Sequence, residues 1–430
     1  MDASRKSNQV EKWLPAIVCA MASFFYIYEF IVRVIPSAIA GSLMQAFHLH
    51  AGGLGILASS FFWAYTPMQI PAGLLYDRYG PRRLLTISIL LCAGATILFA
   101  TTDNIYLAAT ARFMMGLTGA FAFIGPLLIG SRWLKSKHFS LFTGIVQLMG
   151  CIGAIAGLAP IAALSTHFGW RETNLSIAVL GFIFAIAMWI TIRDHPEGHP
   201  VSIQQEWESE TSRLKQVCHR SQTWWVGVYG LTTWAPITVL ATLWGTPFLS
   251  SVYHIDATHA GGLISMIWVG IAVGSPLIGW WSNFIHSRRI PMWICSSLAI
   301  LSSLGVIYSG AVPRWEMSCL LFALGVSAGG QVVSFGTVLD NNSDKVMGTA
   351  VGFNNMAVIA GAIVLQPLVG FLLSFFWNHD MQGGIPVYSS HEFHIALAIV
   401  PIVSLAGLFL GLFAVRETHC VRKFPTEGKS

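Results

Sequence analysis

The sequence predicts an all-α membrane protein with twelve transmembrane helices. Of its 430 residues, 54% are hydrophobic and only 10% are charged, whereas about a quarter of the residues in a soluble domain are charged. A mean hydropathy of +0.64 leaves too little polar surface to cover soluble domains of this total length. Because lipid offers no hydrogen bonds, and because the apolar runs lack the alternation of barrel strands, each run is predicted to be a helix.

Twelve apolar runs follow one another along the chain, separated by polar loops. A helix needs roughly 20 apolar residues to cross a bilayer, and the runs match this length. The first run follows a basic N-terminus and lacks a small-residue cleavage site, so we predict a retained span and not a signal peptide. The predicted spans are residues 14–43, 52–75, 84–102, 105–133, 139–166, 173–192, 223–253, 261–285, 290–311, 316–338, 347–376 and 394–415.

The distribution of basic residues predicts the orientation of these spans. If both termini are cytoplasmic, all but four of the 24 Lys and Arg residues lie in cytoplasmic segments, as the positive-inside rule requires. The exceptions are Arg33 and Arg112 within spans and Arg171 and Arg314 in outer loops. We therefore expect a multi-pass protein of a bacterial inner membrane with both termini in the cytoplasm.

The two halves of the chain repeat one another. The pentapeptide His-Ala-Gly-Gly-Leu begins at His50 and again at His259, and a glycine followed four residues later by Asp or Asn occurs at Gly73 and Gly279. These matches in one register indicate duplication of a six-helix unit. Within the polar segment between the halves, residues 202–215 are predicted either as a short surface helix or as solvated linker. The predicted units are a first bundle at 1–192, a cytoplasmic linker at 193–222 and a second bundle at 223–430.

A cluster of glycine, aspartate and arginine follows the second span. It reads G-x-x-x-D-R-x-G-x-R-R and consists of Gly73, Asp77, Arg78, Gly80, Arg82 and Arg83. The residue types predict that Gly73 permits close helix approach and that Asp77 caps a helix or pairs with an arginine, with a simple topology anchor as the alternative. The motif resembles the signature loop of the major facilitator superfamily, and the resemblance extends over the whole chain. It implies two pseudo-symmetric six-helix bundles, and a gating motif that latches the outward-facing state.

Three charged residues within spans are the candidates for proton coupling. Glu29 and Arg33 lie one helical turn apart in span one, so an ion pair between them is geometrically available. Arg112 lies in span four, where it also needs a partner. Proton symporters of the superfamily pair an acidic residue of span one with the arginine of span four, which implies one buried cluster of Glu29, Arg33 and Arg112. A static tether between helices is the alternative reading.

Uncharged polar and aromatic residues within spans are the candidates for substrate contact. Amides in lipid are costly unless they face a cavity or another helix, so packing hydrogen bonds are an equal alternative for each. Aromatic residues near mid-span are more plausible contacts than those at span ends, which anchor helices at the membrane surface. With Arg33, the predicted substrate-binding residues are Tyr28, Gln147, Tyr229, Trp234, Trp268, Gln331, Asn354 and Asn355.

These residues predict a secondary active transporter and not an enzyme, because catalytic and phosphate-binding motifs are absent from the sequence. The motif and span one also resemble the branch with phagosomal nutrient transporters and lysosomal dipeptide carriers, which implies proton-coupled uptake of an amino acid or short peptide. A carrier or exporter of organic anions or siderophores is the rival, with a non-transporting receptor as a further alternative. We expect a monomer that binds a small molecule and protons in the bilayer, with no cofactor, metal or nucleic acid.

Overall fold

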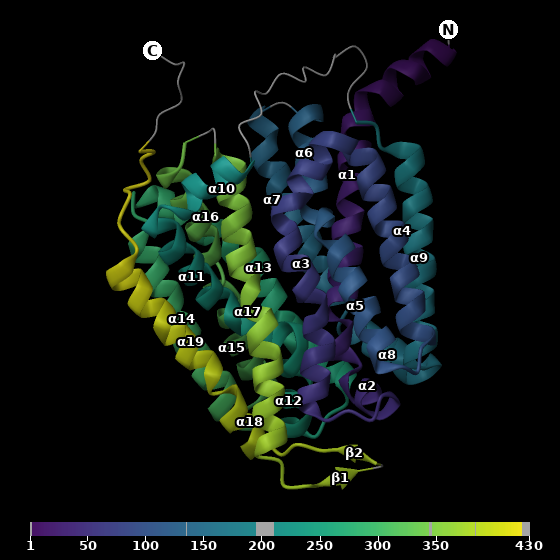
Figure 1. Cartoon of the computed structure of the whole chain (residues 1–430), viewed down its shortest axis with the longest axis vertical. Coiled ribbons are helices and arrows are strands. Elements are labelled where there is room, and N and C mark those ends of the chain that lie inside the picture. Colours follow the sequence, from purple (N-terminus) through teal and green to yellow (C-terminus); the bar gives the residue numbers. More distant parts are fainter. Residues whose placement is uncertain (1, 135, 195–209, 344–345, 383, 424–430) are drawn as a thin grey trace.

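The computed structural model of the chain is a bundle of long helices that run side by side (Figure 1). It describes residues 2–134, 136–194, 210–343, 346–382 and 384–423. Within these ranges, eleven helical segments are long and apolar enough to cross a membrane. Helix α3 (Ala51–Tyr79), with 29 residues, is not one of these eleven segments, but it lies among them in the bundle and is the twelfth transmembrane helix. The predicted all-α fold with twelve transmembrane helices is therefore confirmed.

We call residues 2–194 the first half. Several spans are interrupted helices: α5 and α6 together form one span, and so do α7 and α8. The break between α7 and α8 precedes Pro160, which occupies the first turn of α8, where its missing N–H costs no helix bond. The helices of this half are α1 (Asp2–Ala38), α2 (Ala40–Ala46), α3, α4 (Pro81–Thr101), α5 (Ile105–Gly119), α6 (Phe121–Trp133), α7 (Ser136–Ala156), α8 (Ala159–Phe168) and α9 (Trp170–Thr191).

We call residues 210–423 the second half. A short helix, α10 (Glu210–Cys218), precedes its spans, whereas residues 195–209, where part of a linker helix was expected, lie outside the described ranges. Strands β1 (Met381–Gln382) and β2 (Ile385–Pro386) form a small antiparallel hairpin. The other helices are α11 (Ser221–Pro236), η1 (Ile237–Trp244), α12 (Gly245–Tyr253), α13 (Ala257–Phe284), α14 (Arg289–Tyr308), α15 (Arg314–Ser327), α16 (Gly330–Asn341), α17 (Met347–Phe375), α18 (Ser390–Leu397), α19 (Ile399–Phe409) and η3 (Leu410–Ala414).

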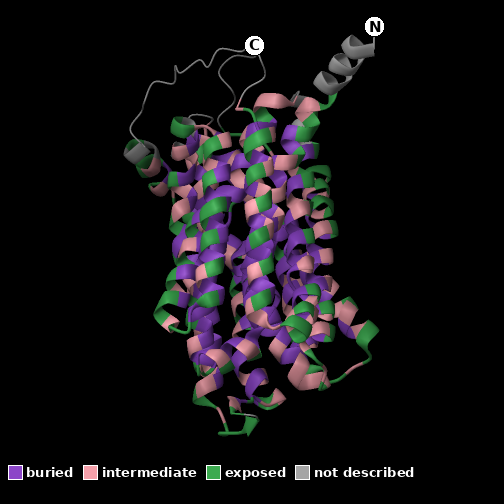
Figure 2. Ribbon diagram, turned by 90° about the vertical axis from the view of Figure 1, so that its right-hand side faces the viewer, coloured by how far each residue is buried: buried purple, intermediate pink, exposed green. Residues whose placement is uncertain are grey.

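The spans are apolar on their outer faces as well as inside the bundle. Figure 2 shows buried residues along the interior of the bundle and exposed ones along its outside. Many of the exposed side chains are large and apolar, for example Leu301 at 68%, Ile190 at 72% and Phe375 at 81%. In water such a surface would be unstable, but in a bilayer it contacts hydrocarbon.

Helix α17 packs along α3, α13 packs along α7 and α8, and α1 packs against η1, so these pairs join the two halves. We name the end of the bundle that carries α2 and β1–β2 the hairpin end, and the opposite end, which carries α10, the linker end (Figure 1). Three hydrogen bonds join the halves near the hairpin end. They are Ser37 Oγ to Thr246 Oγ1 (2.9 Å), Ala51 N to Tyr388 Oη (2.9 Å) and Gly52 N to Ser374 Oγ (3.0 Å).

Helices α3 and α17 diverge from the hairpin end toward the linker end. At the hairpin end, a Cβ atom on Gly55 would lie 2.7 Å from the Gln366 carbonyl oxygen, so the two backbones touch. Further along, a Cβ on Gly352 would have its nearest neighbours at 3.9 Å, and one on Gly73 would have no atom of another element within 4 Å. The expected close approach at Gly73 is therefore wrong for this conformation, because the halves have already separated there.

The segment after the last span is anchored to α14. The Glu417 carboxylate accepts hydrogen bonds from Arg288 N (2.8 Å), Arg289 N (3.0 Å) and Ser287 Oγ (2.6 Å). Partial burial raises the pKa of this carboxyl, but these bonds and one from His419 N outweigh it and lower the pKa to about 2. A carboxylate at a helix N-terminus satisfies free N–H groups and interacts favourably with the helix dipole.

Replacing Glu417 with Gln should therefore destabilise the protein by about 1 kcal/mol at neutral pH. Because the folded-state pKa is below the ordinary value, the stabilisation is present above about pH 5 and is lost as the pH falls toward 2. Thermal unfolding of the detergent-solubilised protein should show a lower Tm for Glu417→Gln at pH 7 and a smaller difference at pH 4. The half-buried Glu316, replaced in the same way, is the control. An equal Tm at pH 7 would contradict the cap.

Candidate functional site

The predicted ion pair between Glu29 and Arg33 is present in α1. Arg33 Nε lies 2.8 Å and Nη2 lies 2.7 Å from Glu29 Oε1. Both side chains are buried, with 0% of Glu29 and 4% of Arg33 exposed. The second carboxylate oxygen, Oε2, has no hydrogen-bond partner in the described structure. One oxygen of a buried carboxylate therefore remains available to a proton or a ligand.

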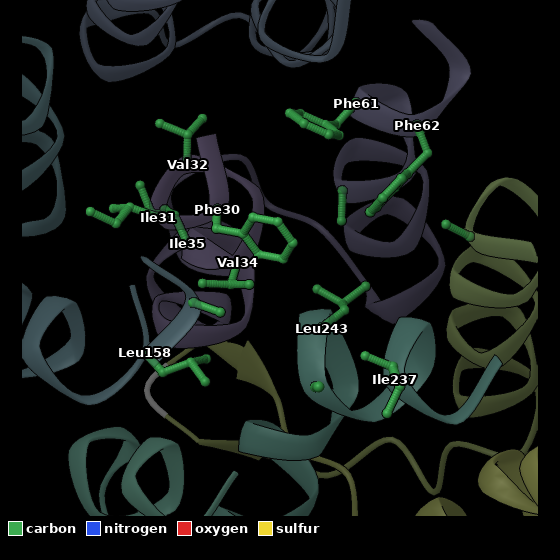
Figure 3. Close-up of a cluster of buried hydrophobic side chains, with 14 of the residues drawn as sticks. Phe30, Ile31, Val32, Val34, Ile35, Phe61, Phe62, Leu158, Ile237 and Leu243 are labelled. Atoms are coloured by element: carbon green, nitrogen blue, oxygen red, sulfur yellow. The ribbon is translucent and has the colours of Figure 1, made fainter. Parts of the chain in front are cut away.

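Aromatic rings surround the Arg33 guanidinium. Its Cζ lies 4.3 Å from the centre of the Phe30 ring and 4.6 Å from that of Tyr65, distances at which cation–π attraction operates. Phe30 meets Trp268 of α13 edge to face at 5.4 Å, so the cluster includes the second half of the chain. Figure 3 shows Phe30 with Phe61 of α3 and Leu243 of η1 around it. The ion pair thus lies where the two halves meet.

Arg112 occupies a different position from the one expected. It is 1% exposed, and it donates from Nη1 to the Val32 carbonyl (2.8 Å) and from Nη2 to the Arg33 carbonyl (3.4 Å). Pro36 in α1 has no N–H, so the Val32 carbonyl lacks the donor that a regular helix provides four residues later. Arg112 supplies that donor. The three residues are buried close to one another, but in the described structure Glu29 pairs with Arg33, and the pairing of the span-one acid with Arg112 that the resemblance implies is not formed in this conformation.

The central charges do not cancel. Glu29 and Arg33 neutralise each other, whereas Arg112 donates to two carbonyl groups and to the Met115 sulfur, and its Nε has no hydrogen-bond partner in the described structure. A buried charge that lacks a counter-charge is costly and marks a functional site by default in a membrane span. The three residues therefore carry one surplus positive charge, which is complementary to an anion.

The predicted amides occupy different environments. Asn355 donates to Gln69 Oε1 (2.8 Å) and so joins α17 to α3 across the two halves. Asn354 is buried and donates to Ser334 Oγ (3.0 Å) within the second half, which is a packing bond. Gln147 on α7 and Gln331 on α16 are half-buried. Of these four residues, Asn355 alone bridges the two halves by a hydrogen bond in the described structure.

The aromatic residues predicted to contact substrate also lie in different parts of the structure. Trp268 belongs to the cluster around Arg33, and Trp234 is 6% exposed on α11. Tyr229 donates its hydroxyl to the Met292 carbonyl (2.8 Å) inside the second half. Tyr28 lies against Gly181 of α9 inside the first half. Tyr28 and Tyr229 are therefore packed within their own halves and do not reach the ion pair, because each points to the side of its helix away from the other half.

Sequence reasoning omitted three residues that lie at this site. Phe30 and Tyr65 stack on Arg33, and Gln69 bonds to Asn355. Gln69 is an amide within a span, and the argument applied to the other amides would have selected it. Phe30 and Tyr65 carry no comparable signal, because the sequence is rich in aromatic residues and does not show which of them face Arg33.

The gating motif spans the last turns of α3, the single connecting residue Gly80 and the first turn of α4. Gly80 has φ +76°, a conformation that glycine adopts without strain. Arg82 N donates to Asp194 Oδ1 (2.7 Å), and the Arg82 guanidinium donates to the Trp189 carbonyl, so the first turn of α4 is bound to the end of α9 and the residues after it. The side chains of Arg78, before Gly80, and Arg83, after it, are exposed. The Asp77 side chain lies outside the described residues.

Replacing Asp77 with Asn is expected to slow transport while leaving substrate affinity largely unchanged. The reason is that Asp77 lies two residues from the end of α3 at the linker end, far along the helix from the level of the Arg33 cluster. Transport into proteoliposomes and a binding isotherm on the same preparation provide the measurement. Equal losses of binding and transport would contradict a gating role.

Comparisons with known proteins give relatives along nearly the whole chain. The uncharacterised transporter YybO of Bacillus subtilis is 22% identical, covering 94% of this chain and 95% of its own length. The probable galactarate/D-glucarate transporter GarP of Escherichia coli is 23% identical (88% and 90% covered). The probable sulfoacetate transporter SauU of Cupriavidus necator is 21% identical (92% of each chain).

Solved structures show the same fold. A bacterial homologue of the human lysosomal transporter Spinster, in an inward-facing and unoccupied conformation, superposes with a TM-score of 0.77 at 15% identity and covers 94% of this chain and 97% of its own. The nucleoside transporter NupG superposes with a TM-score of 0.73 at 14% identity (92% and 99% covered). These relatives are transporters and not enzymes. Residues 16–367 match the Major Facilitator Superfamily model, and with its twelve-helix fold this chain is a membrane transporter that belongs to that superfamily.

Proposed function

We propose that this protein carries a small organic anion together with a proton across the membrane by alternating access. The observation that supports this proposal is the surplus positive charge of Arg112 beside the neutral pair of Glu29 and Arg33. The names of two relatives agree with it, since galactarate and glucarate are dicarboxylates and sulfoacetate carries a sulfonate and a carboxylate. Arginine suits both groups, because its guanidinium can donate two parallel hydrogen bonds.

In this proposal Glu29 carries the proton and the two arginines bind the anion. Protonation of Glu29 removes the counter-charge of Arg33, so two buried guanidinium groups then attract an anion. The hairpin end is closed and α3 and α17 have separated at Gly73, so substrate reaches the site from the linker end in this conformation. Movement of the unit at 1–192 against that at 223–430 about the linker at 193–222 exposes the site to the other side.

The cellular setting is part of the same proposal. The distribution of basic segments supports a cytoplasmic linker end in a bacterial inner membrane, with both termini on that side. In that orientation the present conformation is inward-facing. The protein acts as a monomer in this proposal, because the two halves that form the site pack together within one chain and the site needs no second copy.

A second candidate is a carrier of an amino acid or short peptide, as in the phagosomal and lysosomal branch that span one resembles. The adjacent opposite charges of Glu29 and Arg33 favour it, because they match the ammonium and carboxylate groups of a zwitterion. A zwitterion, however, leaves the extra charge of Arg112 uncompensated. The two candidates therefore differ in the net charge of the ligand.

Binding and counterflow distinguish them. Purified protein is heated with D-glucarate, sulfoacetate, alanine or dialanine, and each ligand is then tested for counterflow in proteoliposomes. We expect D-glucarate or sulfoacetate to raise the Tm, because a ligand that binds the folded state stabilises it, and to support counterflow. Stabilisation by alanine or dialanine alone would establish the second candidate. Binding without counterflow would indicate a receptor.

A further inference from the structure

A groove of about 860 Å³ lies between α3, α5 and α17 on the outside of the bundle. Large apolar side chains form its walls, and they are exposed. The exposed fractions are 48% for Ile56, 58% for Trp63, 43% for Phe113, 62% for Val364 and 53% for Phe371. Because α5 and α17 are membrane spans and α3 lies between them in the bundle, this groove opens to hydrocarbon and not to water.

The serine and threonine hydroxyls in the groove are already bonded within their own helices, so the donors left in its walls are the Trp63 indole N–H and the Tyr106 hydroxyl. Ser59 and Ser60 both donate their hydroxyls to the Ile56 carbonyl of their own helix (3.0 and 2.9 Å). Thr110 donates in the same way to the Tyr106 carbonyl (2.8 Å). Such bonds within a helix leave an apolar surface toward the groove. The lining has no charged side chain, and two aromatic donors cannot compensate the desolvation of a charged or sugar-like ligand. The walls therefore suit an alkyl chain.

The groove lies in one half of the membrane. It is lined by the first part of α3, the beginning of α5 and the last part of α17, and all three segments lie toward the hairpin end. The backbones of α3 and α17 touch beside the groove, where a Cβ atom on Gly55 would lie 2.9 Å from the Cα atom of Pro367, a residue of the groove wall. An occupant therefore comes from the leaflet at the hairpin end.

We propose that this groove binds one acyl chain of a phospholipid from that leaflet. The walls belong to both halves, so a bound chain packs against α3 and α5 on one side and α17 on the other and stabilises the closed hairpin end. The site is also close to the charged centre. Phe61 follows Ser60 in α3, and its ring centre lies 5.7 Å from Arg33 Cζ and 5.1 Å from Arg112 Cζ.

Lipid retention tests the proposal. The protein is delipidated in detergent, incubated with palmitoyl-oleoyl-phosphatidylglycerol and examined by native mass spectrometry. Two variants fill the groove, Ser60→Trp and the milder Ala109→Leu. The control is Ser297→Trp on α14, where the serine likewise donates to its own helix (Trp293 carbonyl, 2.9 Å) beside exposed apolar residues but lies outside the groove.

We expect the native protein and Ser297→Trp to retain one phospholipid, and both groove variants to retain at least fivefold less. Variants are compared only if their Tm in detergent matches that of the native protein, and if Ser60→Trp fails this criterion, Ala109→Leu decides the result. Equal retention by all variants would overturn the proposal. So would retention and transport of palmitate in place of the phospholipid, because the groove would then be an entry route for an amphipathic substrate.

Discussion

Replacing Glu29 with Gln is expected to abolish accumulation of substrate driven by a proton gradient, while counterflow of labelled substrate persists. Glutamine retains the shape and most of the hydrogen bonding of the side chain but cannot bind and release a proton. Counterflow exchanges substrate without net proton movement, so it does not require this step. The remaining transport should also lose most of its pH dependence between about pH 5 and 8, because glutamine does not titrate.

The measurement is uptake into proteoliposomes with an imposed pH gradient, followed by counterflow in the same preparation without a gradient. Glu316→Gln, in the first turn of α15, is the matched control and should accumulate substrate normally. If Glu29→Gln still concentrates substrate, coupling lies elsewhere. Glu29 would then be a tether for Arg33, and sodium coupling or facilitated transport would be the better mechanism.

Replacing Arg112 with Gln should weaken binding of the organic anion by about 100-fold, because loss of a buried charged partner costs several kcal/mol. The same change should lower stability, since the Val32 carbonyl loses its donor and an unsatisfied buried carbonyl costs about 1–3 kcal/mol. The loss of affinity comes from a missing contact with the ligand, whereas the loss of stability comes from a missing hydrogen bond to α1. Binding isotherms and thermal unfolding measure them separately.

Pro36→Ala separates these two roles of Arg112. Alanine restores an N–H that can donate to the Val32 carbonyl, so the stability cost of Arg112→Gln should be smaller in the Pro36→Ala background. Binding should remain weak in the double variant, because the positive charge is still absent. Recovery of binding together with stability would show that Arg112 only supports α1 and does not contact the anion.

Much of the fold could be predicted from the sequence, because the membrane imposes simple rules on a chain. Each span must satisfy its own backbone and must be apolar over about 20 residues, so twelve helices are visible as twelve runs. The motif from Gly73 to Arg83 indicated the family from the sequence alone, because its residues lie close together along the chain. The ion pair between Glu29 and Arg33 was predictable because it lies within one helical turn.

The sequence by itself thus determined what depends on neighbours along the chain: the spans, the duplication and the pair in α1. Only the tertiary structure decided which distant groups meet. Arg112 donates to the Val32 carbonyl, which Pro36 leaves without a donor, and Gln69 accepts a hydrogen bond from Asn355. The Tyr229 side chain points into the second half of the chain, to which it belongs. The physical reason is that helix rotation and tilt in a membrane depend on packing against other helices, and an apolar sequence leaves many rotations with similar hydropathy.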